Sequence, residues 1–370
     1  MRRSLIATLA TAARTAAHRT ASRHPCGACA AADREPGDPG TEVLADRPDG
    51  TVVRHGPVVA KAHAPDTDRA ALDVRLAVAA HPFLHGVLLA PLQGTRASVP
   101  TDPVPPRGAG NRAPGPHRPV DEHAALPSRS LTLWPHGTPV DPTDPDSAPW
   151  AEAGRLLAAL HRVPIDALPG PLPAMRGPVK AARAVARMRN ADVRGSTADA
   201  VLRAWSQLPA WARAETPYPG PATAPHPRPA EGPHPGPAAS TARLCHGDLH
   251  LGQLVRDART GDWLLIDVDD LGLGEPAWDL ARPAAWYAAG LLDPDDWARF
   301  LAAYREAGGP AVPPEGDPWP QLDVPARALT VQTAALALAK CADERRAPDE
   351  AELAMIGSCT RIAALPPEFP

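Results

Sequence analysis

The segment from residue 246 to residue 267 constrains the fold of this chain more than any other part of its sequence. It begins with a polar, glycine-containing loop that includes Asp248, and it continues through a polar turn over residues 257–262 to an apolar run that ends at Ile266 and Asp267. Two apolar runs around such a turn predict a β-hairpin, and the length of the second run is typical of a short buried strand. We therefore predict that Asp248 and Asp267 face each other across one cleft.

Asp248 and Asp267 are of the residue type that phosphoryl transfer requires. One carboxylate orients the attacking hydroxyl and takes its proton, while a second carboxylate and an amide oxygen hold the metal ion that bridges the nucleotide phosphates. Gln253, five residues after Asp248, supplies an amide oxygen. Each motif alone would more often be a turn or a helix cap, so the prediction rests on their joint occurrence at this spacing.

Three short motifs follow one another along the chain: His246-Gly247-Asp248, Ile266-Asp267 and Asp279-Leu280-Ala281. Together they resemble the motifs of the aminoglycoside phosphotransferase and choline kinase family of protein-kinase-like small-molecule kinases. The resemblance implies an α+β fold of two lobes, a small sheet-bearing N-terminal lobe and a larger, mainly helical C-terminal lobe. It also implies ATP and Mg²⁺ as cofactors, and transfer of the γ-phosphate to a hydroxyl of a small molecule such as an aminoglycoside, another amino alcohol or a sugar.

The resemblance implies a role for each motif residue. Asp248 would be the catalytic base, while His246 and Asp279 would brace the catalytic loop by hydrogen bonds. Asp267 would be the principal Mg²⁺ ligand and Gln253 the second one. The family has Asn where this chain has Gln253, and the additional methylene matters because Mg²⁺ demands near-ideal octahedral geometry. The alternative function is therefore a catalytically weak or inactive nucleotide-binding pseudokinase with a regulatory role.

Three short strands are predicted in the N-terminal part, over residues 42–45, 51–54 and 58–62, with turn-forming sequences between them. Lys61 lies in the third strand and is one of only three lysines in a chain that otherwise relies on arginine. An ammonium acts as a point charge toward phosphates, whereas a guanidinium suits bidentate carboxylates. The resemblance implies that Lys61 is the ATP-binding lysine; without it, Lys61 would be an exposed lysine on an edge strand.

The resemblance also implies an acidic partner for Lys61 on the following helix. Apolar residues recur with helical spacing over residues 68–80, and Asp73 is the acid inside this stretch. We therefore assign Asp73 as the partner of Lys61, although the family generally uses Glu at this position.

A predicted strand over residues 130–135 ends at a proline and leads into a stiff loop. The resemblance implies a hinge over residues 131–141, where the backbone around Leu133 would bind the adenine of ATP and Trp134 would pack nearby. A core tryptophan at the end of a strand is the alternative interpretation of Trp134.

Helical periodicity predominates after the hinge. It predicts a helix that begins near Pro149, further helices over residues 179–189, 197–208 and 295–307, and a buried helix over 324–341. Polar residues interrupt the last helix too often for a membrane span. We divide the chain into an N-terminal extension over 1–40, an N-terminal lobe over 41–130, the hinge over 131–141 and a helical lobe over 142–370.

The N-terminal extension and the proline-rich stretches lie outside this pattern. The extension is rich in arginine and alanine, and we interpret it as a helix or a flexible, frayed segment. The 49 prolines of the chain are unevenly placed, and residues 99–127 and 217–238 are rich in proline. We interpret both stretches as flexible insertions rather than as substrate lids.

Composition restricts the partners of the chain. A net charge of −4 and a pI near 6.4 give no indication of a nucleic-acid partner. Five scattered cysteines without a secretory signal favour reduced thiols, so we expect a cytoplasmic protein without a membrane partner. The acidic C-terminal half is compatible with a cationic acceptor. Candidates to line its pocket are Asp293, Asp295, Asp296 and Glu275, although a helix N-cap is the preferred interpretation of Asp293.

Overall fold

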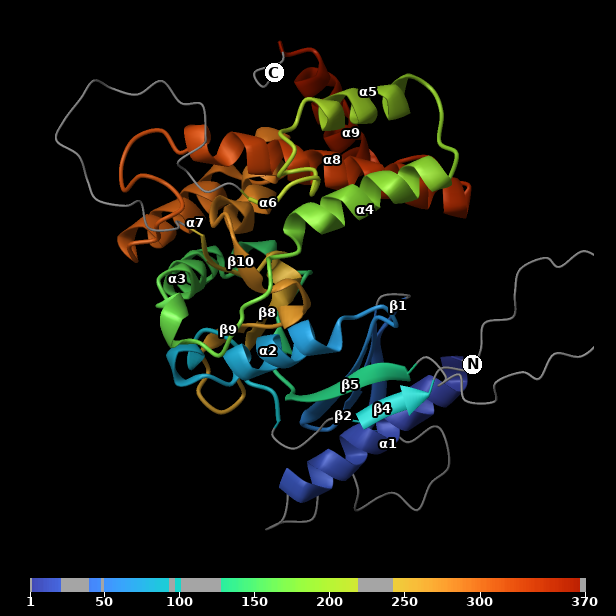
Figure 1. Cartoon of the computed structure of the whole chain (residues 1–370), viewed down its shortest axis with the longest axis vertical. Helices are drawn as coiled ribbons and strands as arrows, with labels where there is room; N and C mark the ends of the chain where they lie inside the picture. The colour runs from blue at the N-terminus through green and yellow to red at the C-terminus, as the bar shows by residue number, and fades with distance from the viewer. Residues whose placement is uncertain are drawn as a thin grey trace, which may run out of the picture. The chain divides into compact units, whose positions relative to one another are not determined.

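The strand-forming residues between 41 and 135 build one antiparallel sheet with the strand order β1-β2-β3-β5-β4. The computed structural model describes residues 2–20, 40–47, 50–92, 97–100, 128–218 and 242–366 (Figure 1). Within these ranges the strands are β1 (Thr41–Arg47), β2 (Gly50–His55), β3 (Val58–His63), β4 (Ala97–Pro100) and β5 (Ser128–Pro135). The predicted strands of this region are confirmed.

Helix α1 (Arg2–Thr20) covers one face of this sheet (Figure 1). Leu9 and Ala13 are fully buried on the helix, and its small alanines allow a close approach to the strands. The strand residues of this core alternate along the sheet, as a half-buried strand requires; they are Val53, Val58, Ala60, Ala62, Leu131 and Leu133. Of the two interpretations of the N-terminal extension, the helix is therefore confirmed over residues 2–20, while residues 21–39 lie outside the described part.

The start of the first proline-rich insertion is a strand, which corrects our interpretation of residues 99–127 as unstructured from their first residue. Val99 pairs with Arg129, and Pro100 pairs with Ser128. β4 is the outermost strand in the order of the sheet, and proline is tolerated at such an edge because no further strand needs its missing N–H. The remainder of this insertion, and residues 219–238 of the second one, lie outside the described residues.

By its internal contacts the chain separates into two units. The first contains α1, the sheet and the start of helix α2 (Arg69–Ala79), and it comprises residues 1–76, 89–138 and 257–259. The second comprises residues 77–88, 139–256 and 260–370. It holds the helices α3 (Trp150–His161), α4 (Gly177–Asn190), α5 (Ser196–Ser206), α6 (Ala277–Ala288), α7 (Pro294–Glu306), α8 (Trp319–Glu344) and α9 (Glu350–Ala363).

Helix α8 is the centre of the second unit and packs against α4, α5, α6 and α9. Most of its faces are buried, which confirms the buried helix predicted over residues 324–341. Helices α3 and α7 approach closely because residue 154 is a glycine: a Cβ there would lie 2.4 Å from the backbone oxygen of Phe300. Among the described helices, none has the length and apolar character that crossing a membrane requires.

Short elements carry the motif residues of the second unit. They are the strands β7 (Arg243–Cys245), β8 (Leu254–Arg256), β9 (Trp263–Leu265) and β10 (Gly272–Gly274), and the 3₁₀ turns η5 (Leu251–Gln253) and η6 (Val268–Asp270). Strands β8 and β9 form the predicted hairpin, with Leu254 opposite Leu265. The remaining described elements are β6 (Thr138–Pro139), η1 (Pro82–Leu84), η2 (Pro145–Ser147) and η3 (Ile165–Ala167).

Candidate active site

The loop of residues 246–250 follows strand β7, which pairs antiparallel with β10. Gly247 has a φ of +86°, and a Cβ at this position would lie 2.6 Å from the backbone oxygen of Asp270. Only glycine meets both conditions without strain. The loop therefore lies directly against the segment that carries Asp267 and Asp270.

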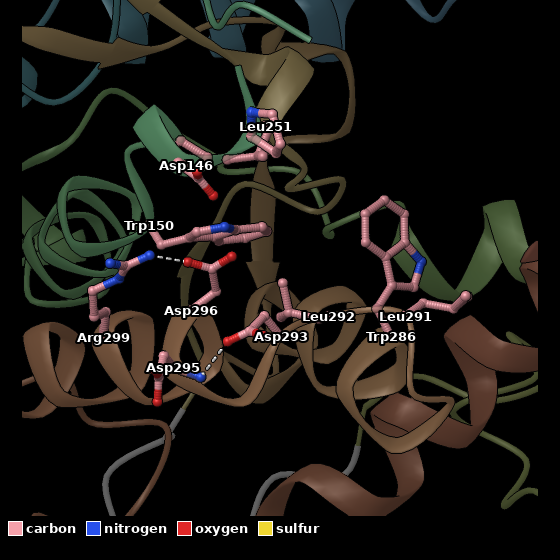
Figure 2. Close-up of a pocket in the computed structure, with 12 residues that line it drawn as sticks. Asp146, Trp150, Leu251, Trp286, Leu291, Leu292, Asp293, Asp295, Asp296 and Arg299 are labelled. Carbon is pink, nitrogen blue, oxygen red and sulfur yellow. Dashed lines mark hydrogen bonds and ion pairs between the residues drawn. The ribbon is translucent and has the colours of Figure 1, made fainter. Parts of the chain in front are cut away.

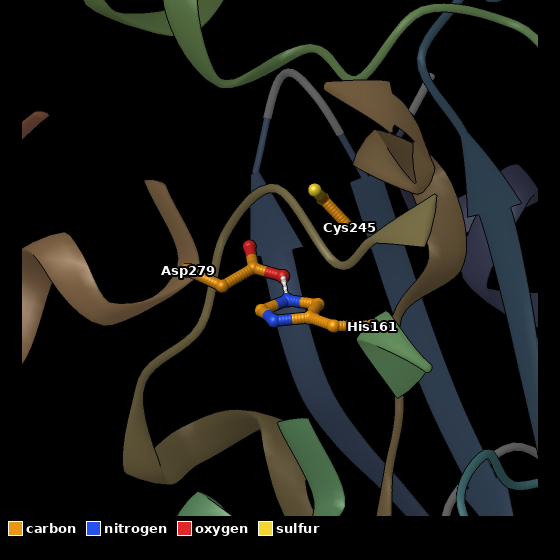
Figure 3. Close-up of side chains that lie close together, drawn as sticks. All are labelled: His161, Cys245 and Asp279. Atoms are coloured by element: carbon orange, nitrogen blue, oxygen red, sulfur yellow. Dashed lines mark hydrogen bonds and ion pairs between the residues drawn. The ribbon is translucent and has the colours of Figure 1, made fainter. Parts of the chain in front are cut away.

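Asp279, in the first turn of α6, holds this loop through its backbone. Its Oδ2 accepts a hydrogen bond from His246 N at 2.6 Å, and its Oδ1 accepts one from Gly247 N at 2.7 Å. Nε2 of His161 lies 3.0 Å from the same Oδ2 (Figure 3). Nδ1 of His161 lies 2.8 Å from the hydroxyl of Tyr304. The carboxylate of Asp279 is buried, so these hydrogen bonds replace the ones that it would make to water.

The ring of His246 ties the loop to the end of β9. Its Nε2 lies 2.7 Å from the carbonyl oxygen of Ile266, so this nitrogen donates a hydrogen bond there. These contacts are of the bracing kind that the family resemblance implies for His246 and Asp279.

Cys245 lies beside His161 and Asp279, and one ligand atom from each residue falls within 4.8 Å of the others (Figure 3). Burial raises the pKa of the Cys245 thiol well above its ordinary value, and the nearby carboxylates of Asp279 and Glu275 add to this. Because metals bind the thiolate rather than the thiol, we interpret the cluster as a structural brace.

The carboxylate of Asp248 lies between two cations. Its Oδ1 accepts a hydrogen bond from Nη2 of Arg282 at 2.6 Å, and its Oδ2 accepts one from Nζ of Lys180 at 2.6 Å. Burial alone would raise the pKa of Asp248, but the charges of Lys180 and Arg282 outweigh it and hold the pKa below its ordinary value. Asp248 is therefore ionised and oriented at neutral pH.

Asp270 shares Lys180 with Asp248. Nζ of Lys180 lies 2.8 Å from Asp270 Oδ2, and Nε of Arg176 lies 3.7 Å from Asp270 Oδ1. Burial raises the pKa of Asp270, and Lys180 offsets only part of this. Burial acts in the opposite sense on Lys180, but the attraction of Asp270 and Asp248 prevails and raises its pKa. Lys180 thus remains charged.

Asp267 and Gln253 lie on adjacent strand ends. The amide of Ile266 donates to the backbone oxygen of Gln253 at 2.9 Å, which extends the β8–β9 pairing by one step. Asp267 has a φ of +64°, a conformation that costs a non-glycine residue about 1–3 kcal/mol and is common at functional sites. The Asp267 carboxylate accepts a hydrogen bond from Asp269 N at 3.3 Å. Carboxylate and amide oxygens are ligands of the hard type that Mg²⁺ prefers, so the chemistry of these two residues fits the predicted metal site.

The four residues predicted to bind the nucleotide lie in the first unit. Lys61 alternates with Ala60 and Ala62 along β3, which places it on the sheet face opposite α1, with Thr132 as its partner in register. Asp73 is half-buried on α2. Leu133 belongs to the core beneath α1, and its backbone oxygen accepts a hydrogen bond from Leu92 at 2.9 Å.

Trp134 is 8% exposed, and its indole N–H donates to the hydroxyl of Thr132 at 2.9 Å. That hydroxyl also lies 2.8 Å from Nε2 of His63. The ring of Trp134 is therefore packed within the first unit, as a core tryptophan at a strand end would be.

A pocket of about 550 Å³ opens beside the start of α7 (Figure 2). This volume falls within the roughly 300–1,000 Å³ that small-molecule sites occupy. Figure 2 shows the carboxylates of Asp146 and Asp296 on either side of the Trp150 ring. Its lining comprises Pro145, Asp146, Ala148, Trp150, Leu251, Trp286, Leu291, Leu292, Asp293, Asp295, Asp296 and Arg299.

Three of the four acids predicted to line an acceptor pocket do line this one. Asp293 also caps α7, because its carboxylate accepts a hydrogen bond from Asp295 N at 2.8 Å, which confirms the N-cap interpretation of Asp293. Asp296 pairs with Arg299. Glu275 is not among the residues that line this pocket; its carboxylate accepts hydrogen bonds from the hydroxyl of Tyr218 and the amide of Ala277.

Sequence reasoning missed Lys180, Arg282 and the two pocket tryptophans, Trp150 and Trp286. The rarity of lysine, which singled out Lys61, applies equally to Lys180. Arg282 directly follows the Asp-Leu-Ala motif, and Trp286 lies four residues further on the same face of α6. The sequence thus contained indications for these residues, but only the tertiary structure shows that Lys180 and Arg282 bind Asp248 and that the two tryptophans line the pocket.

His250 should make the stability of the protein depend on pH below neutrality. Burial lowers the pKa of His250 to about 4, and the attraction of Asp248 offsets only part of this. The unfolded chain takes up the proton near pH 6.5. Between pH 6.5 and 4 the unfolded chain therefore binds more protons than the folded protein, and the free energy of unfolding decreases as the pH is lowered. The full loss is about 3 kcal/mol.

His250→Asn keeps an acceptor for the amide of Gly252, which Nδ1 of His250 binds at 3.1 Å, but it cannot titrate. We expect urea unfolding at pH 7, 5.5 and 4 to show a smaller pH dependence for this variant than for the wild type. Parallel curves would contradict the assignment.

The family model of the phosphotransferase enzyme family matches residues 106–322. No curated protein matches the chain by sequence. A choline/ethanolamine kinase family protein from Mesorhizobium loti aligns with a TM-score of 0.50 and 15% identity, over 95% of this chain and 95% of that chain.

Two further solved structures align with lower scores. A macrolide 2'-phosphotransferase type I has a TM-score of 0.41 and 18% identity, over 95% of this chain and 97% of that chain. An aminoglycoside phosphotransferase from Streptomyces rimosus has a TM-score of 0.43 and 18% identity, over 80% and 94%.

The likeness to the M. loti structure confirms the predicted protein-kinase-like α+β fold. The family match covers more than half of the chain and includes the 246–250 loop, Asp267 and Asp279. The protein therefore belongs to the phosphotransferase enzyme family, as its motifs predict, and is a small-molecule phosphotransferase.

Proposed function

We propose that the protein transfers the γ-phosphate of ATP to a hydroxyl of a cationic small molecule, such as an aminoglycoside, another amino alcohol or an aminosugar. The observation that carries the proposal is the ionised carboxylate of Asp248, which Lys180 and Arg282 hold in one orientation beside the Asp267 segment. An oriented, charged carboxylate is the group that aligns an attacking hydroxyl in phosphoryl transfer.

In this reaction the acceptor oxygen forms a bond to the γ-phosphorus, and the bond from that phosphorus to the bridging oxygen of ADP breaks. The hydroxyl proton moves to the carboxylate of Asp248, which later releases it to solvent. A lowered pKa makes Asp248 a weak base, but phosphoryl transfer depends mainly on positioning and electrostatics. We therefore assign to Asp248 the alignment of the hydroxyl as much as the acceptance of its proton.

Asp267 and Gln253 would hold Mg²⁺, and Lys61 would bind the ATP phosphates with Asp73 as its acidic partner. When bound, the metal ion neutralises charge on the transferred phosphoryl group. Gln253 is buried, so its amide has little room to adjust. Gln253 is one methylene longer than the Asn that the family has at this position. This greater length supports the alternative function, a weak or inactive nucleotide-binding pseudokinase.

The pocket of Figure 2 is our candidate for the acceptor site. It combines aromatic rings with carboxylates, and a cation gains about 0.5–2 kcal/mol over the face of a tryptophan. Leu251, three residues after Asp248, is part of its wall. Trp286 lies about 6 Å along α6 from Arg282, which binds Asp248. The pocket therefore opens beside the loop that carries the proposed base.

The direct test is ATP consumption by the purified protein with Mg²⁺ and a panel of aminoglycosides, amino alcohols and aminosugars. Each acceptor is matched with a neutral analogue that lacks the amine. We expect turnover only with acceptors, and a higher KM for the neutral analogues. Nucleotide binding without turnover on any acceptor would favour the pseudokinase alternative.

Trp286→Leu tests the pocket itself. Loss of the ring should raise the KM for a cationic acceptor about tenfold with little change in kcat, whereas Trp286→Phe should stay close to the wild type. An unchanged KM in Trp286→Leu would place the acceptor elsewhere without contradicting the phosphotransferase activity.

A further inference from the structure

Lys180 is the more exposed of the two cations that bind the Asp248 carboxylate. One ammonium bridges Asp248 and Asp270, at 2.6 Å and 2.8 Å. Arg282 binds the other oxygen of Asp248, and its Nε donates to the backbone oxygen of Leu249 at 3.1 Å, which ties it to the loop. The side chain of Lys180 is 31% exposed and that of Arg282 only 17%. Lys180 is therefore the more exposed of the two cations, and it is the one that links Asp248 to a second carboxylate.

The helix itself does not favour a lysine at this position. Helix α4 begins at Gly177, so Lys180 lies at the end of its first turn, where the helix dipole disfavours a cation. The backbone fixes this turn, because Arg176 N donates to the backbone oxygen of Asp270 at 3.1 Å. The presence of a lysine at position 180 is thus explained by its two carboxylate partners and not by the stability of the helix.

We propose that Lys180 is a positioning residue for phosphoryl transfer, which holds Asp248 in one orientation between Asp270 and Arg282 so that its remaining lone pairs meet the acceptor hydroxyl. The inference rests on the proposed function. A carboxylate offers about four acceptor sites, and the two cations leave one on each oxygen. Lys180 makes and breaks no covalent bond; the proton moves to Asp248 as described above.

The charged groups around Asp248 determine how the loss of Lys180 would change the pKa of Asp248. Burial favours the neutral acid, and Lys180 and Arg282 are the largest opposing influences on the pKa of Asp248. Without Lys180, the carboxylate should therefore take up its proton at a higher pH. The charged and titratable groups around this pair are Arg176 and Lys180 from the start of α4, Arg282 from α6, His246 and His250 from the loop, and Asp267 and Asp270 from the segment before β10.

Lys180→Met tests the proposal in the acceptor-dependent assay. We expect kcat to fall at least tenfold, the KM for the acceptor to change less than twofold, and the acidic limb of the pH profile to move up by about one unit. Lys180→Arg should restore most of kcat. Asp248 keeps Arg282 and Asp270 keeps Arg176, so the variant retains a cation for each acid and should fold.

Lys340→Met is the matched control, because it removes an exposed lysine from α8 by the same substitution. An unchanged kcat and pH profile in Lys180→Met, an equal loss in Lys340→Met, or no recovery in Lys180→Arg would each overturn the proposal.

A titration of the protein without acceptor separates this proposal from the proposed function. Carboxyl ¹³C NMR of aspartate-labelled protein, with the Asp248 signal assigned by its loss in Asp248→Asn, should give a midpoint at least one pH unit higher in Lys180→Met than in the wild type. An unshifted midpoint would overturn the role of Lys180. Absence of transfer by the wild type, with the midpoint shifted, would count against the proposed function alone.

Discussion

Asp248→Asn should lower acceptor-dependent ATP turnover by roughly 10²–10⁴-fold, the usual contribution of a general base. Asparagine has nearly the same shape but cannot take the hydroxyl proton, and it removes the negative charge between Lys180 and Arg282. Nucleotide binding should be unchanged, because the substitution leaves Lys61 and Asp73, the residues that we propose to bind the nucleotide, in place. The measurement is kcat and kcat/KM for the best acceptor, together with the affinity for ATP.

Asp262→Asn is the matched control, since it makes the same substitution at an exposed position in the β8–β9 turn. It should behave as the wild type. Equal turnover by Asp248→Asn and the wild type would show that Asp248 is not the base. If both bind ATP and neither transfers phosphate to any acceptor, the pseudokinase alternative accounts for the result.

Asp279→Ala should lower the free energy of unfolding by about 3–5 kcal/mol, because it leaves three buried groups without a hydrogen-bond acceptor and each costs about 1–3 kcal/mol. The substitution leaves the amides of His246 and Gly247 and the ring of His161 without their common acceptor. Since whole domains are stable by only about 5–15 kcal/mol, the loss should be visible as a large shift in the urea midpoint.

Activity should fall with stability in Asp279→Ala even at temperatures where the variant is folded, because the backbone of the 246–250 loop loses its anchor. Asp343→Ala removes a carboxylate whose partner, Arg187, is mostly exposed, and such surface pairs contribute little. A urea midpoint of Asp279→Ala as close to the wild type as that of Asp343→Ala would refute the bracing role.

Local sequence was enough for most of the elements. Alternating apolar residues and turn signals predicted strands β1, β2, β3 and β5 and the β8–β9 hairpin, and helical spacing predicted α4, α5, α7 and the buried α8. The errors occurred where local signals are weak. Val99 and Pro100 resemble low-complexity sequence, and only the pairing of Val99 with Arg129 makes them an edge strand. The alanine-rich α1 shows its role only against the sheet that it covers.

The candidate site divides in the same way. His246, Asp248, Gln253, Asp267 and Asp279 were proposed as site residues from short motifs and from the family that these motifs resemble. The packing of the β7 and β10 segments then explains why Gly247 must be glycine. Local patterning could therefore name the residues of the loop and their order.

The partners of Asp248 were decided by tertiary structure alone. Lys180 precedes it by 68 residues and Arg282 follows it by 34, and the two side chains come from different helices. Which helix face meets a loop depends on how all the helices of the unit pack, and apolar periodicity constrains the buried face but not the polar neighbours at its rim. The sequence by itself thus determined the family, the fold and the motif residues, while the packing of α4 and α6 determined the charges that orient the carboxylate.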